Sequence, residues 1–490
     1  MTALARSLFP VINVLGLVVM IFAATMLVPL AVAFVGRDKA LLAYDEAFLI
    51  TLAIGAALWF VTRRFKRELA PRDGFLLVAL VWTTLPAVAT LPLLLHLPDL
   101  SFTDAYFETM SGLTTTGATV LTGLDELPLS INVWRHLLVW IGGMGVIVLA
   151  VAILPLLGVG GSQIYKAEAA GPLKETKLTP RIAETAKGLY LIYLSISAVC
   201  VIAYRAAGMS WPDAFMHMCS TMGLGGFSSH DASFAYWDSP AIEMTAVVFM
   251  LAAGVNFSMH FLAWRRRTLA VYWRDIEAKA FVAVTLAAAA AVALFLWLHG
   301  QYTDFATALR YALFNVVSIA TTTGYASTDY AQWPILAPLV MLFLCGFATC
   351  AGSTGGGIKM IRAVILAKQA MREFVRILHP RVVNPVRIGE HVIENRVIFA
   401  VLAFMLIYGA VIIWATFLLL LLSDLDVVTA FTAIIACVNN TGPGLGQVGP
   451  AGNYQGLNDA STWVCTAAML VGRLEMMSVL VLFTPAFWRK

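Results

Sequence analysis

The chain has 490 residues, of which 60% are apolar and 12% are charged, and its mean hydropathy is +0.84. Such a composition is far from that of soluble globular domains and places the chain in a lipid bilayer. Its six cysteines lie in or beside apolar runs without metal-ligand spacing, which argues against both a disulfide framework and a transition-metal site. The net charge of +4 is small, and we expect no nucleic-acid partner.

Apolar runs long enough to cross about 30 Å of hydrocarbon recur along the whole chain. The first run is too long for a signal peptide and lacks a small-residue cleavage site, so we interpret it as a retained helix. The ten predicted membrane spans are 10–36, 44–63, 74–95, 134–158, 187–207, 240–263, 278–299, 335–366, 396–423 and 461–487.

Basic residues collect in every second connection between these spans. These basic connections contain Arg63 to Arg72, Lys166 to Lys187, Arg265 to Lys279 and Lys359 to Arg396. The connections between them are acidic or neutral. Because positively charged loops stay in the cytoplasm, we expect both termini on the cytoplasmic side of a multi-pass membrane protein.

After the first two spans, one pattern occurs four times: a span, a short segment with a polar start, a glycine-bearing turn and a second span. The turns lie roughly 100 to 120 residues apart, which is the scale of a whole repeated unit. The short segments are 104–115, 213–223, 304–321 and 426–438, and none is long enough to cross the membrane. They start at Asp104, Asp213, Asp304 and Asp426, which suit helix N-termini that face the outer water.

The predicted fold is therefore an all-α integral membrane protein with four pseudo-repeated span–pore-loop–span units around a central ion pathway, preceded by a two-helix hairpin. The expected divisions are a leading hairpin over 1–68 and pore repeats over 69–170, 171–275, 276–392 and 393–490. The third repeat also carries a candidate gate loop and a long cytoplasmic connection.

The four turns are predicted to form one ring of backbone carbonyls, which is how a membrane pore replaces the hydration shell of K⁺. A half-helix that enters from outside directs its negative C-terminal end toward the centre and favours a cation there. Glycine reaches the required backbone angles without strain. The predicted K⁺-binding filter residues are Thr115, Thr116, Gly117, Leu224, Gly225, Gly226, Thr322, Thr323, Gly324, Asn440, Thr441, Gly442 and Gly444.

Two of the turns contain more than one candidate glycine. We choose Gly226 and Gly444, because a large apolar or aromatic residue follows each, as Tyr325 follows Gly324. Counting from Ala430-Phe431 favours Gly442 in the fourth turn instead, so that choice stays open.

The second span of the third repeat is predicted to break in the middle. Its glycines are poor helix formers, each costing ~1 kcal/mol relative to alanine. Exposed backbone at membrane depth needs an aqueous neighbour, which places the loop in the conduction path below the filter. The predicted gate residues are Gly346, Ala348, Gly352, Ser353, Thr354, Gly355, Gly356, Gly357 and Arg473. The alternative interpretation of the loop is a tight helix crossing lined by small residues.

Arg473 lies near the middle of the last predicted span. A charged arginine at this depth costs ~2.5–3.5 kcal/mol on insertion scales, so it normally faces a cavity or a partner. We hypothesise that Arg473 projects into the pore beneath the filter, contacts carbonyls of the gate loop and repels cations. A packing arginine paired with carbonyls away from the pore is the alternative.

With these turns, the chain resembles the Trk/Ktr/HKT potassium-transport family over nearly its whole length, and its TrkH-type pore subunits most closely. Further motifs that carry the resemblance are Gly142-Gly143-Met144-Gly145, Ala150 to Pro155, Gly352 to Lys359 and Asn439 to Gly446. The resemblance implies K⁺ as the transported ion, since a serine in place of Gly117 marks sodium-preferring relatives. It also implies that the loop from 346 to 357 is the gate and that the protein lies in a bacterial inner membrane.

The same resemblance implies a homodimer seated on a cytosolic, nucleotide-binding regulatory subunit of the TrkA type. This chain has no Walker A sequence, and we expect neither a nucleotide nor a transition metal on it. The basic connection 367–395 suits this partner or the head groups of anionic membrane lipids.

Other functions are also compatible with parts of the sequence. An intramembrane enzyme would use His136, His217 and His260 with Glu108, but no catalytic motif supports it. A K⁺ symporter coupled to H⁺ or Na⁺ would use the same filter, as would a less selective Na⁺/K⁺ pathway.

Overall fold

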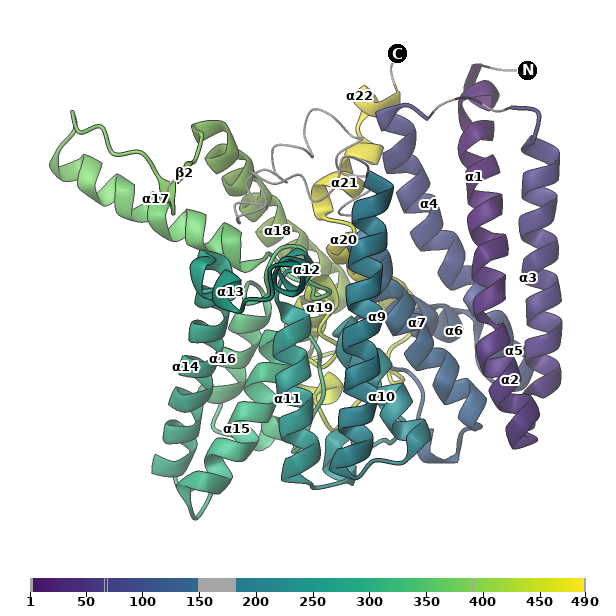
Figure 1. Ribbon diagram of the computed structural model, residues 1–490, viewed down its shortest axis with the longest axis horizontal. Coiled ribbons are helices and arrows are strands. Elements are labelled where there is room, and N and C mark those ends of the chain that lie inside the picture. The colour runs from purple at the N-terminus through teal and green to yellow at the C-terminus, as the bar shows by residue number, and fades with distance from the viewer. Residues whose placement is uncertain (1–2, 66, 68, 149–181, 390, 489–490) are drawn as a thin grey trace.

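The structure, a computed structural model, describes residues 3–65, 67, 69–148, 182–389 and 391–488 (Figure 1). The motif Ala150 to Pro155, the basic residues Lys166, Lys174, Lys177 and Arg181, and the expected boundary at 170 lie outside the described residues. The all-α prediction is confirmed. Within the described ranges the only strands are β1 (Arg387–Ile388) and β2 (His391–Val392), which pair antiparallel beside a long helical arm.

The leading hairpin is formed by α1 (Ala3–Thr25), α2 (Leu27–Gly36) and α3 (Leu41–Thr62) at one edge of the molecule. α1 packs along α3 and against α4 (Pro71–Ala89) of the next unit. α22 lies at the same end of the molecule as the start of α1 (Figure 1). Both ends on one side agree with an even number of membrane crossings.

After the hairpin, the chain forms four successive units, which we call quarters. Each quarter contains a span, a short re-entrant helix and a second span. The first quarter contains α4, α5 (Leu91–His96), α6 (Phe102–Leu113) and α7 (Leu129–Val148). The second contains α9 (Ile182–Ala207), α10 (Trp211–Gly223), α11 (Pro240–Gly254), α12 (Phe257–Arg266) and α13 (Ala270–Arg274). The third contains α14 (Ile276–Leu298), α15 (Phe305–Ala320), α16 (Leu336–Cys345) and α17 (Met360–Leu378). The fourth contains α18 (Asn395–Leu422), α19 (Val427–Asn439), α20 (Asp459–Arg473), α21 (Met476–Leu480) and α22 (Pro485–Trp488).

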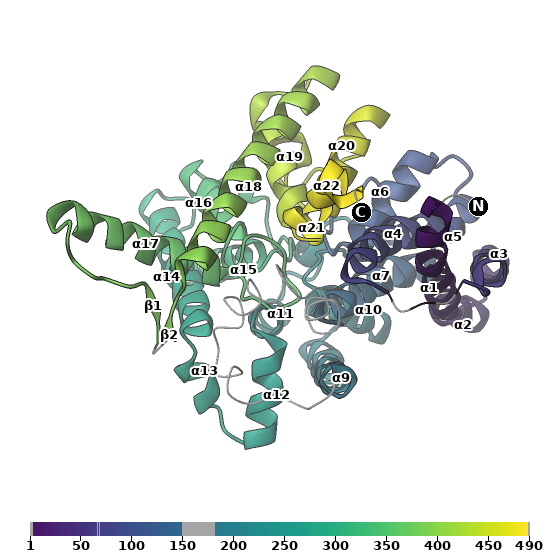
Figure 2. The ribbon, with the colours of Figure 1, turned by 90° about the horizontal axis from the view of Figure 1, so that it is seen from above.

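The quarters close into a ring, which Figure 2 shows from above. The second span of each quarter packs against the short helix of the next: α7 on α10, α11 on α15, α16 on α19 and α20 on α6. The last of these contacts joins the fourth quarter to the first. The four short helices therefore surround one common axis, although they are far apart in the sequence.

Several predicted spans are not continuous helices. The span at 240–263 bends by 94° between α11 and α12, and the span at 461–487 bends by 110° between α20 and α21. The span at 335–366 ends at Cys345 and resumes at Met360, as its glycine content predicts. By length and composition, six helices of the described chain can cross a membrane, or up to eight if each bent pair is one span. Of the ten predicted spans, those at 240–263 and 461–487 are bent, and residues 149–158 of the span at 134–158 lie outside the described residues.

The four short helices begin with hydrogen-bonding caps. Ser101 and Ser210 accept from the backbone N–H groups of Asp104 and Asp213, so in these quarters the aspartate lies three residues inside the helix. In the other two quarters the aspartate is itself the cap, and Asp304 accepts from the N–H of Thr307 at 2.8 Å. Either arrangement places a carboxylate at the positive end of the helix dipole.

A candidate ion filter and gate

The turns that follow the four short helices share one backbone conformation. A non-glycine residue in each turn adopts a left-handed conformation: Thr115 (φ 54°), Leu224 (φ 55°), Thr322 (φ 59°) and Asn440 (φ 54°). Such residues cost of order 1–3 kcal/mol and persist where the surroundings dictate them. Four at matching positions indicate a common backbone requirement rather than a preference of the individual residues.

One hydrogen bond recurs in all four turns and ends each short helix. An N–H group one residue after the left-handed position donates to a carbonyl five residues earlier. The pairs are Thr116 to Ser111 (2.8 Å), Gly225 to Ser220 (3.0 Å), Thr323 to Ser318 (2.8 Å) and Thr441 to Ala436 (2.9 Å). This is the bond of a Schellman cap, which reverses the chain direction at the C-terminus of a helix. The chain therefore leaves the axis of each short helix at this point, near the centre of the molecule.

Two residues beyond each left-handed position, a glycine packs against the neighbouring quarter. A Cβ added there would lie too close to a backbone atom of the next quarter: 2.5 Å at Gly117, 2.5 Å at Gly226, 2.0 Å at Gly324 and 2.8 Å at Gly442. Three of the four also have positive φ, whereas Gly226 does not. The contacts run from the first quarter to the second, third and fourth and back to the first. The four glycines therefore form a closed ring.

Gly444 is not part of this ring. A Cβ on Gly444 would meet Thr432 and Val448 of its own quarter, whereas one on Gly442 would lie 2.8 Å from the carbonyl oxygen of Thr116. The structure therefore places Gly442, not the chosen Gly444, at the level of Gly117. Counting from Ala430-Phe431 gives Gly442, and in the structure Gly442 follows the left-handed Asn440 by two residues, as the other ring glycines follow theirs.

The other predicted filter residues lie beside the ring in the same turns. Leu224 differs from the rest, because its side chain is fully buried in an apolar cluster and only its backbone belongs to the turn. Among the described residues, the side-chain oxygens Thr115 Oγ1 and Asn440 Oδ1 are buried and have no hydrogen-bond partner. Unpaired buried oxygens next to a ring of carbonyls suit a dehydrated alkali cation.

The segment between α16 and α17 lies directly against the turns of three quarters. Gly356 N–H donates to Thr322 Oγ1 at 2.8 Å, and Thr354 Oγ1 donates to the carbonyl of Met222 at 2.8 Å. A Cβ on Gly356 would lie 2.0 Å from the Asn439 carbonyl oxygen, so only glycine fits there. The predicted gate residues from Gly346 to Gly357 are thus brought together with the ring, on the side of the short-helix C-termini.

Arg473 is the last residue of α20 rather than the middle of a straight span, because the helix bends after it. Its guanidinium is buried and donates to the carbonyl of Thr354 in the loop at 2.9 Å and to that of Gly142 in α7 at 3.5 Å. Its Nε has no partner within the described structure. The predicted contact between Arg473 and gate-loop carbonyls is therefore present.

The sequence analysis missed the residue that holds both ends of this loop. Glu277, in the first turn of α14, is buried, and its Oε1 accepts from the N–H of Ala351 at 2.8 Å and from that of Ile361 at 3.1 Å. The second N–H belongs to the N-terminus of α17, where a negative charge is favourable. An acidic residue just before an apolar span, close to the capping Asp275, was the available signal.

Comparison with known proteins was made for the whole chain. Residues 43–490 match the protein family described as TrkH, cation transport protein. The chain belongs to the TrkH family. It is 47% identical to the Trk system potassium uptake protein TrkH of Salmonella typhimurium and 46% identical to that of Escherichia coli K12, covering 98% of this chain and 99% of each relative. The crystal structure of the potassium transporter TrkH from Vibrio parahaemolyticus superposes with a TM-score of 0.90 at 44% identity, over 98% of this chain and 99% of that one.

Membership of the TrkH family confirms the prediction of a transport protein rather than an enzyme. The histidines considered for catalysis are bound to backbone instead: His136 to the carbonyl of Asn132, His217 to that of Asp213 and His260 to that of Ala252. Glu108 forms a fully buried ion pair with Arg135 at 2.7 Å. Its other oxygen accepts from Val120 N–H, just after the first filter turn of this TrkH-family chain.

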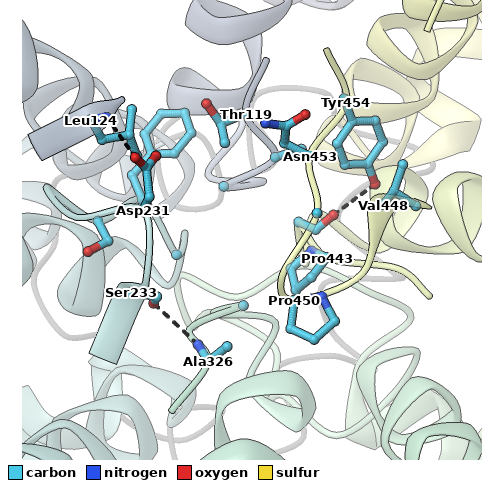
Figure 3. Close-up of a pocket in the computed structure, with 18 of the residues that line it drawn as sticks. Thr119, Leu124, Asp231, Ser233, Ala326, Pro443, Val448, Pro450, Asn453 and Tyr454 are labelled. Atoms are coloured by element: carbon cyan, nitrogen blue, oxygen red, sulfur yellow. Dashed lines mark hydrogen bonds between the residues drawn. The ribbon is translucent and has the colours of Figure 1, made fainter. Parts of the chain in front are cut away.

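A pocket with about 560 Å³ of atom-free space lies on the side of the glycine ring opposite the loop between α16 and α17. It is lined by residues of all four quarters (Figure 3). Hydrogen bonds between quarters hold its wall: Asp231 accepts from Leu124 N–H at 3.2 Å, and Ser233 accepts from Ala326 N–H at 3.3 Å. Tyr454 donates to the carbonyl of Gly442 at 2.8 Å. The pocket thus lies beside the four predicted filter turns.

A histidine beside this pocket predicts a pH-dependent stability. His230 contacts Asp125, and its Nε2 lies 3.5 Å from Asp213 Oδ1. Burial lowers the pKa of His230, but its hydrogen bonds and ion pairs with Asp213 and Asp125 outweigh burial, so its pKa is raised above 6.5. The stabilisation is complete below pH 6.5 and is lost as the pH rises through the raised pKa.

We therefore expect the melting temperature of the protein in detergent to fall between pH 6 and pH 9, and His230→Gln to reduce that fall. His299→Gln, at an exposed histidine bound only to a backbone carbonyl, serves as the control and should keep the wild-type slope. Equal slopes in wild type and His230→Gln would contradict the assignment.

A second prediction concerns the tether of the gate loop. Glu277→Ala should raise basal ⁸⁶Rb⁺ uptake into proteoliposomes several-fold, because two buried N–H groups of the closed loop lose their acceptor and each costs about 1–3 kcal/mol. Glu277→Gln keeps the acceptor oxygen and should give a smaller rise. The matched control is Glu394→Ala, at an exposed carboxylate before the first span of the fourth quarter. Uptake unchanged in Glu277→Ala would show that this tether does not hold the loop closed.

Proposed function

We propose that this chain is a potassium-selective uptake pathway across a bacterial inner membrane, with the ring of Gly117, Gly226, Gly324 and Gly442 as its filter. The observation that carries the proposal is the closed ring itself, in which each glycine packs against backbone of the next quarter. The names of the relatives, potassium uptake protein and potassium transporter, support K⁺ as the ion.

Ion selection follows from the direction of the four short helices. Their C-terminal ends meet at the ring, and their aligned dipoles make the centre negative. Carbonyls of the residues before each glycine then replace the water around K⁺, together with threonine hydroxyls in the first and third turns. A hydrated cation enters from the outer pocket, where Asp231 adds negative charge.

The proposed gate is the segment from Gly346 to Gly357 together with Arg473. The loop crosses beneath the filter, and the arginine joined to Thr354 places a positive charge where a cation would leave the filter. Conduction therefore requires both groups to move. The loop described here, hydrogen-bonded to Thr322, Met222 and Arg473, corresponds to a closed state.

The proposal includes the arrangement of the chain in the membrane and its partners. The leading hairpin and the four repeats are the proposed structural units, and both termini lie in the cytoplasm with the basic connections. We propose a homodimer surrounded by lipid and controlled by a cytosolic nucleotide-binding subunit of the TrkA type. The chain itself is proposed to carry K⁺ only as transported ion. Among the described residues no cluster of three His, Cys, Asp or Glu side chains forms a metal site.

The test is ⁸⁶Rb⁺ uptake into proteoliposomes of the purified chain, with K⁺, Na⁺ or Li⁺ as competitor and with or without a pH gradient. Competition by K⁺ but not Na⁺, independent of the gradient, is the expected result. A requirement for H⁺ or Na⁺ gradients would indicate a coupled symporter that uses the same filter. Equal competition by Na⁺ would contradict potassium selectivity.

A further inference from the structure

We propose that the ion pair between Arg362 and Glu475 is a latch that couples the position of α17 to Arg473. This inference rests on the gate proposed above and identifies the contact through which a movement outside the membrane reaches it. Arg362 lies in the first turn of α17, and Glu475 lies two residues after Arg473 at the bend between α20 and α21.

The geometry of this pair is that of a fixed contact rather than a surface pair. The distance between Arg362 Nη2 and Glu475 Oε2 is 2.6 Å, and the side chain of Arg362 is 3% exposed while that of Glu475 is 36% exposed. The guanidinium also donates to the carbonyl of Ile358 at 3.3 Å and lies 4.1 Å from the centre of the Phe404 ring. A guanidinium held on three sides has little freedom, so Arg362 keeps a fixed position against Glu475 as long as α17 stays in place.

The chain from the gate loop into α17 contacts the bend between α20 and α21 at two neighbouring points. Thr354 contacts Arg473, and eight positions later Arg362 contacts Glu475. Between these points lie Gly355, Gly356 and Gly357, which pack closely against neighbouring segments. The two contacts therefore hold one glycine-rich stretch at both ends.

The bend itself is strained. Glu475 has φ 58°, a left-handed conformation that costs a non-glycine residue roughly 1–2 kcal/mol. Its carbonyl accepts from the N–H of Ser478 at 2.7 Å, which helps to start α21. The ion pair with Arg362 is a second contact that keeps this residue in place. Releasing it would allow the bend after Arg473 to relax and the arginine to leave Thr354.

α17 is shaped so that it can transmit a displacement from its outer half to Arg362. It extends away from the body of the molecule as an arm (Figure 1), and its outer half exposes large apolar residues, with Ile377 74% and Leu378 75% exposed. A force on this outer half acts on Arg362 at the inner end. Displacement of α17 would thus break the Arg362–Glu475 pair and free Arg473 in one movement.

The test is basal ⁸⁶Rb⁺ uptake by the full chain in proteoliposomes without any cytosolic partner. Glu475→Gln removes the charge without changing the size of the side chain, and we expect basal uptake to rise about three- to tenfold, as for the loss of one charge-assisted contact. Competition by K⁺ over Na⁺ should be unchanged, since the filter is not altered. The matched control is Glu373→Gln, which removes an exposed pair with Arg376 on the same helix and should leave basal uptake as in wild type.

A charge exchange distinguishes the latch from general damage. Glu475→Lys should raise basal uptake further, because two like charges then meet, and the exchange variant Arg362→Glu with Glu475→Lys should restore low uptake. If Glu475→Gln leaves uptake at the wild-type level while Arg473→Ala raises it, the latch is wrong and the gate stands. If neither variant nor wild type carries ⁸⁶Rb⁺ with K⁺ competition, the proposed function itself fails.

Discussion

Replacing Arg473 with alanine should raise potassium flux strongly, even without a cytosolic partner. A positive charge about 8 Å from a passing cation, at an effective dielectric constant of ~20, raises its energy by about 2 kcal/mol, or roughly thirtyfold in flux. The substitution also removes the hydrogen bond that holds Thr354 of the loop. Initial rates of ⁸⁶Rb⁺ uptake into proteoliposomes measure the effect.

Arg205→Ala is the control for the loss of a hydrogen bond from an arginine to a backbone carbonyl, at an exposed arginine. Arg205 also donates to a backbone carbonyl, that of Met209 at 3.0 Å, but it lies at the far end of α9, away from the gate. Its removal should leave flux unchanged. Unchanged or reduced flux in folded Arg473→Ala would count against an electrostatic barrier and in favour of a purely structural arginine.

The second large effect is expected at the tightest point of the ring. Gly324→Ala should lower ⁸⁶Rb⁺ uptake at least about tenfold and weaken the preference for K⁺ over Na⁺. The new Cβ would lie 2.0 Å from the Thr441 carbonyl oxygen, in a backbone with φ 90° that alanine rarely adopts. Strain of about 1–3 kcal/mol at such a residue can be relieved only by moving a carbonyl of the fourth turn.

Gly456→Ala provides the comparison, because a Cβ at this glycine meets nothing within 4 Å and the backbone does not have positive φ. Uptake and ion competition by this variant should equal those of wild type. Both variants must elute as folded protein from detergent before uptake is compared. Normal selectivity in folded Gly324→Ala would remove Gly324 from the filter.

Much of the architecture follows from the order of apolar and polar residues. Spans, short helices and glycine turns alternate in the sequence, and the observed short helices begin and end within two residues of the predicted segments. The break before Met360 was predictable because Gly352 to Gly357 contains four glycines. Both features are local, since they depend on helix propensity and on capping.

The two sharp bends were not predicted from the hydrophobic pattern. Gly254-Val255-Asn256 interrupts an otherwise apolar run, and only the cap bond from Asn256 to the N–H of Ser258 shows that a new helix begins there. The gate loop is bound to this bend, because the N–H of Phe257 donates to the carbonyl of Gly352 at 3.0 Å. Hydropathy averages over a window of residues, so it does not report a change of direction that a distant segment stabilises.

The sequence by itself determined that this chain crosses a membrane, that it contains four similar units, and that glycine turns follow four short helices. It did so because burial in lipid and helix capping depend on neighbouring residues. Only the tertiary structure decided that Gly442 rather than Gly444 closes the ring, that Glu277 tethers the loop and that Arg362 pairs with Glu475. These contacts join residues that lie from 74 to more than 300 positions apart, and their partners are selected by distance in the fold, which no local pattern of residues encodes.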